Sequence, residues 1–284
     1  MSQKEKVRSL REKVSVVLAE MKPVIDSSAK LAWQPSTGYR RLILRAMLIR
    51  QYECLESIVH LVQNDRGYAG GSLLRPACEE LIWAKYLTQL DDRDANGLLL
   101  CLVRKEMFDT LKAQDDHIGR TRTKELGLLH QLDGATKAQP DTRSKLSSLG
   151  RKLGWDRRTV DAGIPPSTQF LARKTGMTSL YNFLFHASSR YVHFSSSELL
   201  RRAWGTPEEI TIRSANFADY WSAFALAWGL KLLSDTYLVL HESLVRDGVV
   251  DPEIDGTTVI SAYKEVAEFG FVPIITPQEL NWNW

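Results

Sequence analysis

The stretch SANFADYWSAFALAWGLKLLSDTYLVLHESLVR, residues 214–246, contains the most apolar window of the chain. It is too long for a strand and shows no alternation of period two, so it predicts a long helix. The window 220–230 is about half of the roughly 20 apolar residues that a membrane span needs. Lys231 and Asp235 follow this window on one helix face. We therefore predict a buried core helix that crosses no membrane, with Lys231 and Asp235 forming a structural pair.

Helical spacing of apolar residues recurs along most of the chain, and no alternation of strands and helices would build a parallel sheet. A basic segment at about 119–169 gives weaker signals, because Gly154, Gly163 and Pro165-Pro166 interrupt it. The predicted fold is all-α, a multi-helix bundle with long antiparallel helices and a looser basic segment. Long helices are expected at 37–64, 72–90, 92–117 and 178–204, shorter ones at 122–133, 141–153, 167–174 and 257–269, and a connector with one extended piece at 206–213.

The N-terminal region carries an amphipathic pattern of its own. Its apolar residues alternate spacings of three and four, as in the seam of a short coiled coil. The seam consists of Val7, Leu10, Val14, Val17, Met21 and Val24. We expect it either to dock on the body of the same chain or to pair with a second copy in a homodimer. The chain is therefore divided into an N-terminal amphipathic helix over 1–35, a helical core domain over 36–270 and a C-terminal tail over 271–284.

Composition indicates an ordinary globular protein, with 44% hydrophobic and 25% charged residues and three cysteines. The cysteines lie in apolar surroundings without a C-x-x-C pair, which indicates buried thiols in a reducing compartment. The first residues are charged and lack the apolar core of a signal peptide. We therefore expect a cytoplasmic protein without a cofactor.

Positive charge is concentrated in two regions, although the net charge is only +3. Residues 1–50 carry eleven Lys or Arg against four Asp or Glu, and residues 101–175 carry fifteen against nine. The segment 119–169 would suit nucleic acid, with Trp155 stacking a base among basic side chains. The alternatives are a solvated basic face with a packed Trp155, or packing between unlike faces of domains or subunits.

Arg75 and Glu79 stand four residues apart near the start of a predicted helix. Residues at this spacing share a helix face, and the surrounding stretch is apolar, so both charges need partners. Either they form a structural salt bridge, or Arg75 holds an anionic or carbonyl group while Glu79 acts as acid, base or orienter. The preceding Gly70-Gly71-Ser72 is predicted as a turn that would present free N–H groups to an anion.

His186, Ser189 and His193 lie at offsets of three and seven in the predicted helix 178–204, and therefore on one face. Histidine can act as general acid or base, or it can bond carbonyls and carboxylates in a core. We expect the helices to bring Arg75, Glu79 and His193 together. The catalytic candidates are His193, Glu79, Arg75 and His186, and the substrate-binding candidates are Ser189, Arg190, Tyr181 and Tyr191.

Motif searches speak against several reaction classes. The chain has no G-x-x-x-x-G-K-[ST] phosphate loop, no H-E-x-x-H zinc motif and no G-x-S-x-G elbow around Ser189. No metal ligand set is therefore predicted.

A pattern of Arg-x-x-x-Glu followed by Tyr and Ser-x-x-x-His resembles a family of bacterial all-α proteins catalogued only as a domain of unknown function. The resemblance covers about residues 40–240 and implies a helical fold without an established activity. A comparison with the HEPN helical nucleases rests on fold alone, because no histidine here has the Arg-x(4–6)-His spacing. The residues that carry the family pattern are Leu73, Leu74, Arg75, Glu79, Tyr181 or Tyr191, Ser189 and His193.

Two functions are compatible with these residues. The first is a hydrolase or nuclease-like effector, in bacterial defence or as a toxin, that acts on a phosphate-bearing substrate. His193 would be general acid or base, Arg75 the anion clamp and Glu79 the orienter, with His186 assisting. The second is a non-enzymatic interaction protein in which the Arg, Glu and His side chains form a buried network that fixes helix register. An open site favours the first, and a sealed network favours the second.

Overall fold

The computed structural model describes residues 3–31, 38–193, 195–206, 208–213, 216–250 and 264. The predicted helix at 257–269 and the tail at 271–284 lie almost entirely outside this range, with residue 264 the one exception. By packing, the chain falls into two compact units. Unit 1 draws on residues 1–32, 43–88 and 172–284, and unit 2 on residues 33–42 and 89–171.

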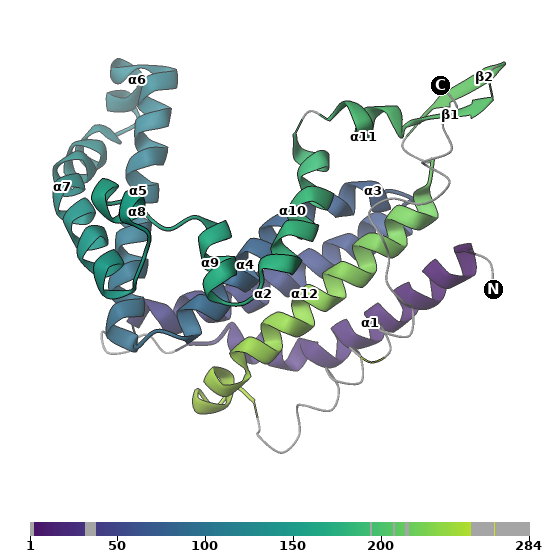
Figure 1. Cartoon of the computed structure of the whole chain (residues 1–284), viewed down its shortest axis with the longest axis horizontal. Helices are drawn as coiled ribbons and strands as arrows, with labels where there is room; N and C mark the ends of the chain where they lie inside the picture. Colours follow the sequence, from purple (N-terminus) through teal and green to yellow (C-terminus); the bar gives the residue numbers. More distant parts are fainter. Residues whose placement is uncertain are drawn as a thin grey trace. The chain divides into compact units, whose positions relative to one another are not determined.

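Helices make up nearly all of the described structure, as the all-α prediction requires, and the exception is one two-stranded hairpin (Figure 1). The elements are α1 (Gln3–Ser28), α2 (Gly38–Gln63), α3 (Gly67–Gly70), the 3-10 turn η2 (Gly71–Leu73), α4 (Leu74–Thr88), α5 (Asp92–Ile118), α6 (Arg120–Glu125), α7 (Leu129–Lys152), α8 (Arg157–Ala162), α9 (Thr168–Lys174), α10 (Thr178–Val192), α11 (Ser196–Leu200), β1 (Ala203–Thr206), β2 (Glu209–Ile212) and α12 (Ala218–Arg246).

Helix α12 is the centre of unit 1, and it packs against α1, α3 and α4. Figure 1 shows it running alongside α1. Apolar side chains cover α12 on all sides and most are buried, Phe224 and Leu232 among them. By length and composition the helix could cross a membrane, but 72% of its most apolar window is buried inside the structure. That burial is typical of a core helix.

The N-terminal seam docks on the body of the same chain. Val7, Leu10, Val14, Val17 and Met21 are all buried, and α1 packs against α12. Of the two alternatives that the heptad pattern left open, in-chain docking is the one the structure contains. The homodimer stays a prediction.

The glycine-rich stretch before Arg75 is helical, so the predicted turn is wrong. A Cβ on Gly67 would lie 2.7 Å from the Cα of Ser222, and one on Gly71 would lie 2.7 Å from the ring of Tyr191. Glycine is needed here because α3 and η2 approach α12 and α10 so closely that no side chain fits. The stretch continues directly into α4 and offers no glycine loop to an anion.

Unit 2 is built on the pair α5 and α7, with α6 and α8 packed beside them (Figure 1). The basic segment 119–169 is more regular than expected, since α7 runs through Pro140 without a break. A proline removes one N–H donor, and here packing of α7 along α5 outweighs that loss. Trp155 is buried with its ring against Gly150, so it does not stand out to stack a base.

The predicted helix 178–204 is shorter than expected and ends at Val192. His193 has extended backbone, and after the short α11 the chain forms an antiparallel hairpin of β1 and β2. The extended piece predicted at 206–213 corresponds to β2. It pairs with β1, a strand that the sequence did not indicate. Domain boundaries at residues 35 and 270 stay predictions.

Candidate functional site

Arg75 lies in the first turn of α4, and its side chain is about one quarter exposed. Its Nε donates to Oε1 of Glu79 at 3.1 Å, one helical turn later. The Glu79 side chain is 34% exposed, so water reaches the pair. Partial exposure limits what the pair adds to stability, but it leaves both groups accessible to a ligand.

Helix α10 packs against α4 and brings two polar groups to Arg75. Nη1 of Arg75 lies 2.9 Å from Nε2 of His193 and 3.4 Å from Oγ of Ser189. His193 is exposed, while Ser189 is half-buried. The four residues Arg75, Glu79, Ser189 and His193, called here the Arg75 cluster, therefore meet at an edge of unit 1 that is open to water.

The hydrogen bond between Arg75 and His193 needs an acceptor on the imidazole ring. A guanidinium has only donors, so Nε2 of His193 must present its lone pair. This contact requires the tautomer that carries its proton on Nδ1. Such an imidazole can accept a proton at Nε2 when a ligand displaces the guanidinium.

An aromatic ring also packs against the guanidinium of Arg75. The Cζ of Arg75 lies 4.7 Å from the centre of the Phe185 ring, within the range of a cation–π contact. Tyr181 packs against Phe185 with ring centres 5.3 Å apart. Burial raises the pKa of Tyr181, and the Glu79 carboxylate adds to the increase. Within the part of the chain that the structure describes, Nη2 of Arg75 has no acceptor.

Four of the predicted site residues lie outside the cluster, namely the polar residues His186 and Arg190 and the aromatic residues Tyr181 and Tyr191. His186 is exposed, its ring stands edge-on to the Phe185 ring with centres 6.1 Å apart, and it makes no hydrogen bond or ion pair with the described residues. It does not share a helix face with His193, because α10 ends before His193. Arg190 is half-buried and makes no hydrogen bond or ion pair with the described residues.

Tyr191 belongs to a neighbouring aromatic group rather than to the open edge. Its ring stands edge-on to Tyr68 at 4.8 Å and to Trp221 at 5.4 Å. Burial raises its pKa strongly, and the carboxylate of Glu198 adds to the effect. A direct contact of Tyr191 with substrate is therefore not what this geometry favours.

The sequence did not indicate the charged residues around Tyr191. The side chain of Glu198 is 2% exposed and pairs with Arg201 at 3.1 Å. Arg201 lies over the Trp221 ring, and Arg202 over the ring of Tyr68. In the sequence, Glu198 and Arg201 stand out only by their i,i+3 spacing. This spacing is too common among charged residues to predict a buried ion pair.

The predicted pair of Lys231 and Asp235 is confirmed, with Nζ 2.8 Å from Oδ2. The Asp235 carboxylate and the Glu79 carboxylate both act on the thiol of Cys78. Burial, followed by these two carboxylates, raises the pKa of the Cys78 thiol to about 12. Cys78 is therefore a packed thiol rather than a nucleophile. Among the described residues, no group of three or more His, Cys, Asp and Glu side chains could hold a metal ion.

The chain matches a known protein family. The family of unknown function DUF5677 matches residues 41–210, more than half of the chain. The chain belongs to this family. All members of the Arg75 cluster fall inside the DUF5677 match, whose description states no activity. The expectation drawn from the Arg-x-x-x-Glu and Ser-x-x-x-His pattern is thereby confirmed. No match was found among curated proteins or among solved structures.

Proposed function

We propose that the chain is an enzyme that cleaves a phosphate ester at the Arg75 cluster. One observation carries the proposal, the hydrogen bond of 2.9 Å between Arg75 Nη1 and His193 Nε2 at a solvent-exposed edge. It places a permanent cation directly beside a group that can transfer a proton. Phosphate-ester cleavage needs both, a cation for the phosphoryl oxygens and a proton acceptor or donor for the reacting oxygens.

The remaining contacts support distinct roles. Glu79 binds Nε of Arg75 and so orients the guanidinium, whose Nη2 hydrogens are open to phosphoryl oxygens. The hydroxyl of Ser189 would donate a hydrogen bond to the bound phosphate. When the phosphate takes the donors of Arg75, Nε2 of His193 becomes free to accept the proton of attacking water. The water oxygen forms a new bond to phosphorus while the P–O bond to the ester oxygen breaks, and the proton held by His193 passes to that departing oxygen.

The expected test uses three esters, p-nitrophenyl phosphate, bis-p-nitrophenyl phosphate and a single-stranded RNA labelled at its 5′ end. H193A should lower the rate on the responsive ester by about 10²-fold or more, the usual contribution of general acid–base catalysis. R75A should weaken substrate binding as well. H186A is the matched control, because His186 lies on the same helix outside the cluster and should leave the rate unchanged.

The proposal is contradicted if the wild-type protein turns over none of the three esters. Equal rates for H186A and H193A would contradict it as well. Both histidine variants are compared by circular dichroism and thermal melting. Loss of activity at unchanged melting temperature separates a catalytic role from a structural one.

A second candidate is an interaction protein in which the same residues hold α4 against α10. The mutual bonding of Arg75 with Glu79, Ser189 and His193 favours it. H193A should then lower the melting temperature and leave no reaction to lose. The cluster is not sealed from water, and for that reason we place the enzyme first.

We further propose a cytoplasmic location and a role as a bacterial effector that meets nucleic acid. The three cysteines are free, which supports a reducing compartment. The basic segment gives weaker support for nucleic acid, because Arg120, Arg122, Lys145, Lys152 and Arg157 pair with carboxylates. Binding of the labelled RNA at increasing salt measures this directly.

A further inference from the structure

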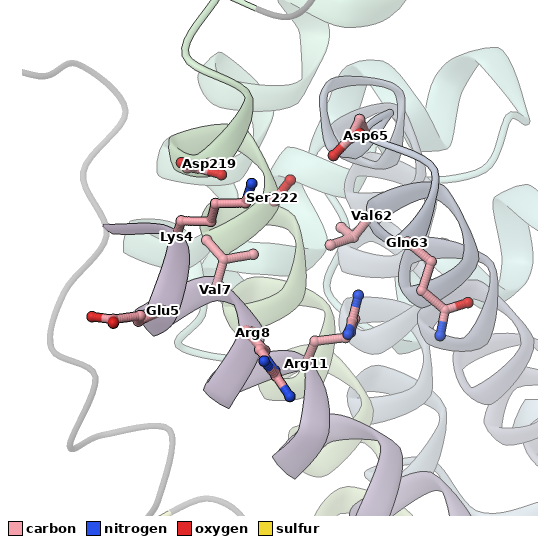
Figure 2. A pocket seen from close by; sticks show the side chains of 10 residues that line it. All are labelled: Lys4, Glu5, Val7, Arg8, Arg11, Val62, Gln63, Asp65, Asp219 and Ser222. Carbon is pink, nitrogen blue, oxygen red and sulfur yellow. The ribbon is translucent and has the colours of Figure 1, made fainter. Parts of the chain in front are cut away.

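A second feature of unit 1 is a pocket of about 610 Å³, away from every residue of the Arg75 cluster. It lies between the beginning of α1, the end of α2 and the beginning of α12 (Figure 2). Its volume is in the range of small-molecule sites. The lining residues are Lys4, Glu5, Val7, Arg8, Arg11, Val62, Gln63, Asp65, Asp219 and Ser222.

The pocket has a small buried base and charged walls. Val7, Val62 and Ser222 are buried. In Figure 2 the side chains of Lys4 and Arg11 extend from α1 toward the ends of α12 and α2. The two residues are seven apart on α1, so they share one helix face. Cations therefore come from one helix only.

Two of the three lining carboxylates, Asp65 and Asp219, come from the other two helices, while the third, Glu5 of α1, points away from them in Figure 2. Asp219 lies in the first turn of α12, where the positive end of the helix dipole favours an acidic side chain. Asp65 follows α2 and adopts left-handed backbone with φ of 55°. The turn is closed by the N–H of Arg66, which donates to the carbonyl of Leu61 at 2.7 Å. Aspartate is among the residues that tolerate this conformation.

These opposite charges face one pocket without pairing. Within the described residues, Lys4, Arg11, Asp65 and Asp219 form no ion pair with each other or with any other group. Neighbouring charges on α1 behave differently, since Arg8 pairs with Glu12 at 3.0 Å. Cations and carboxylates that line a common pocket more than 4 Å apart leave room for a ligand between them.

We infer that this pocket binds a small zwitterion of the free amino acid or short peptide class. The carboxylate of the ligand meets Lys4 and Arg11, and its ammonium group meets Asp65 and Asp219. A ligand with only one charge would leave the opposite wall unpaired, and so the pocket selects for both charges. The inference does not depend on the proposed phosphate-ester reaction, because the two sites share no residue.

Calorimetric titration of the full chain with the dipeptide Ala-Ala tests the inference. Three matched probes carry fewer charges, N-acetyl-Ala-Ala, Ala-Ala amide and N-acetyl-Ala-Ala amide. Ala-Ala should bind, each singly capped form should bind about tenfold more weakly or worse, and the doubly capped form should not bind. Tenfold is the loss expected when one charge-assisted contact is removed.

Variants locate the binding. R11A and D219N should each weaken Ala-Ala binding by about tenfold or more, as expected for one lost charged contact. K22A is the control, since Lys22 lies on α1 outside the pocket and pairs with Asp26. R11Q replaces R11A if loss of the longer side chain lowers the stability of the fold. No heat with Ala-Ala, equal binding of a singly capped form, or equal binding by R11A and K22A would overturn the inference.

Discussion

At the scale of single residues, Arg75 gathers acceptors from two helices. Glu79 comes from its own helix, while Ser189 and His193 come from more than a hundred residues later in the chain. Arginine suits this role because its planar fork donates in several directions at once. A lysine in the same place would be a point charge and could not hold the same partners in fixed geometry.

Gly71 controls how closely η2 approaches α10, and so bears on the position of His193. We expect G71A to destabilise the protein by about 1–3 kcal/mol, the usual cost of overpacking. The added Cβ would meet the Tyr191 ring at 2.7 Å, and that ring is held between Tyr68 and Trp221. Displacing Tyr191 should move His193 and lower the proposed activity. Urea denaturation and the ester assay measure the two effects.

The matched control for G71A is G134A in α7. A Cβ on Gly134 has nothing within 4 Å, and the residue lies in an exposed helix interior. G134A should raise the free energy of unfolding by about 0.5–1 kcal/mol, because alanine is the better helix former. If G71A behaved like G134A, the close approach of Gly71 to Tyr191 would be wrong.

Residue spacing predicted two ion pairs correctly. The i,i+4 rule identified the pairs Arg75–Glu79 and Lys231–Asp235, because both partners lie on one helix. It placed His186 incorrectly, since the rule assumes that the helix continues to His193. Nothing local in the sequence marks the end of α10 at Val192, where the chain leaves the helix for α11 and the hairpin.

At the scale of elements, a buried ion pair ties the end of α12 to α2. Nη2 of Arg45 lies 3.1 Å from Oδ2 of Asp247, and both side chains are at most 10% exposed. Nη1 of Arg45 also donates to the carbonyl of Lys30, just after α1. The pair therefore holds the ends of α1 and α12 against α2.

We expect D247A to cost about 3–5 kcal/mol, because it leaves the Arg45 guanidinium buried without its counter-charge. The double variant R45M/D247A should recover a large part of the loss, since a buried charge is then no longer present. E12A is the control, because the Arg8–Glu12 pair is exposed and worth about 1 kcal/mol or less. Urea denaturation gives all three values. A loss in D247A no larger than in E12A would refute the role of the pair.

Element boundaries were predictable where local chemistry sets them. Asp91 caps α5 by accepting from the N–H of Asp94 at 2.7 Å, as an acidic residue before an apolar run suggests. The break expected between the helices at 122–133 and 141–153 was wrong, because α7 continues through Pro140. The cost of that proline is local, whereas the packing that offsets it involves α5. The turn predicted at Gly70-Gly71-Ser72 was wrong for a similar reason, since close packing between helices is not visible in local sequence.

At the scale of the whole molecule, the chain is two compact units that share one backbone. The Arg75 cluster and the charged pocket both belong to unit 1. The paired basic residues of α6, α7 and α8 belong to unit 2. The sequence indicated a basic segment with weak helical patterns at 119–169. It could not indicate that this segment builds a separate core, because the contacts that define a unit are long-range.

Because the chain has two compact cores, we expect a cavity in one unit to leave the amides of the other unit protected from hydrogen exchange. Leu10 in α1 and Leu146 in α7 are both 1% exposed, so L10A and L146A are matched substitutions in units 1 and 2. Each should cost about 2–5 kcal/mol locally. In native-state hydrogen exchange, L146A should speed exchange of the α5 and α7 amides and leave α12 unchanged, and L10A should do the reverse. Units that open separately exchange separately. Faster exchange across both units in either variant would mean that the chain unfolds as one body, and the division into two units would then carry no energetic meaning.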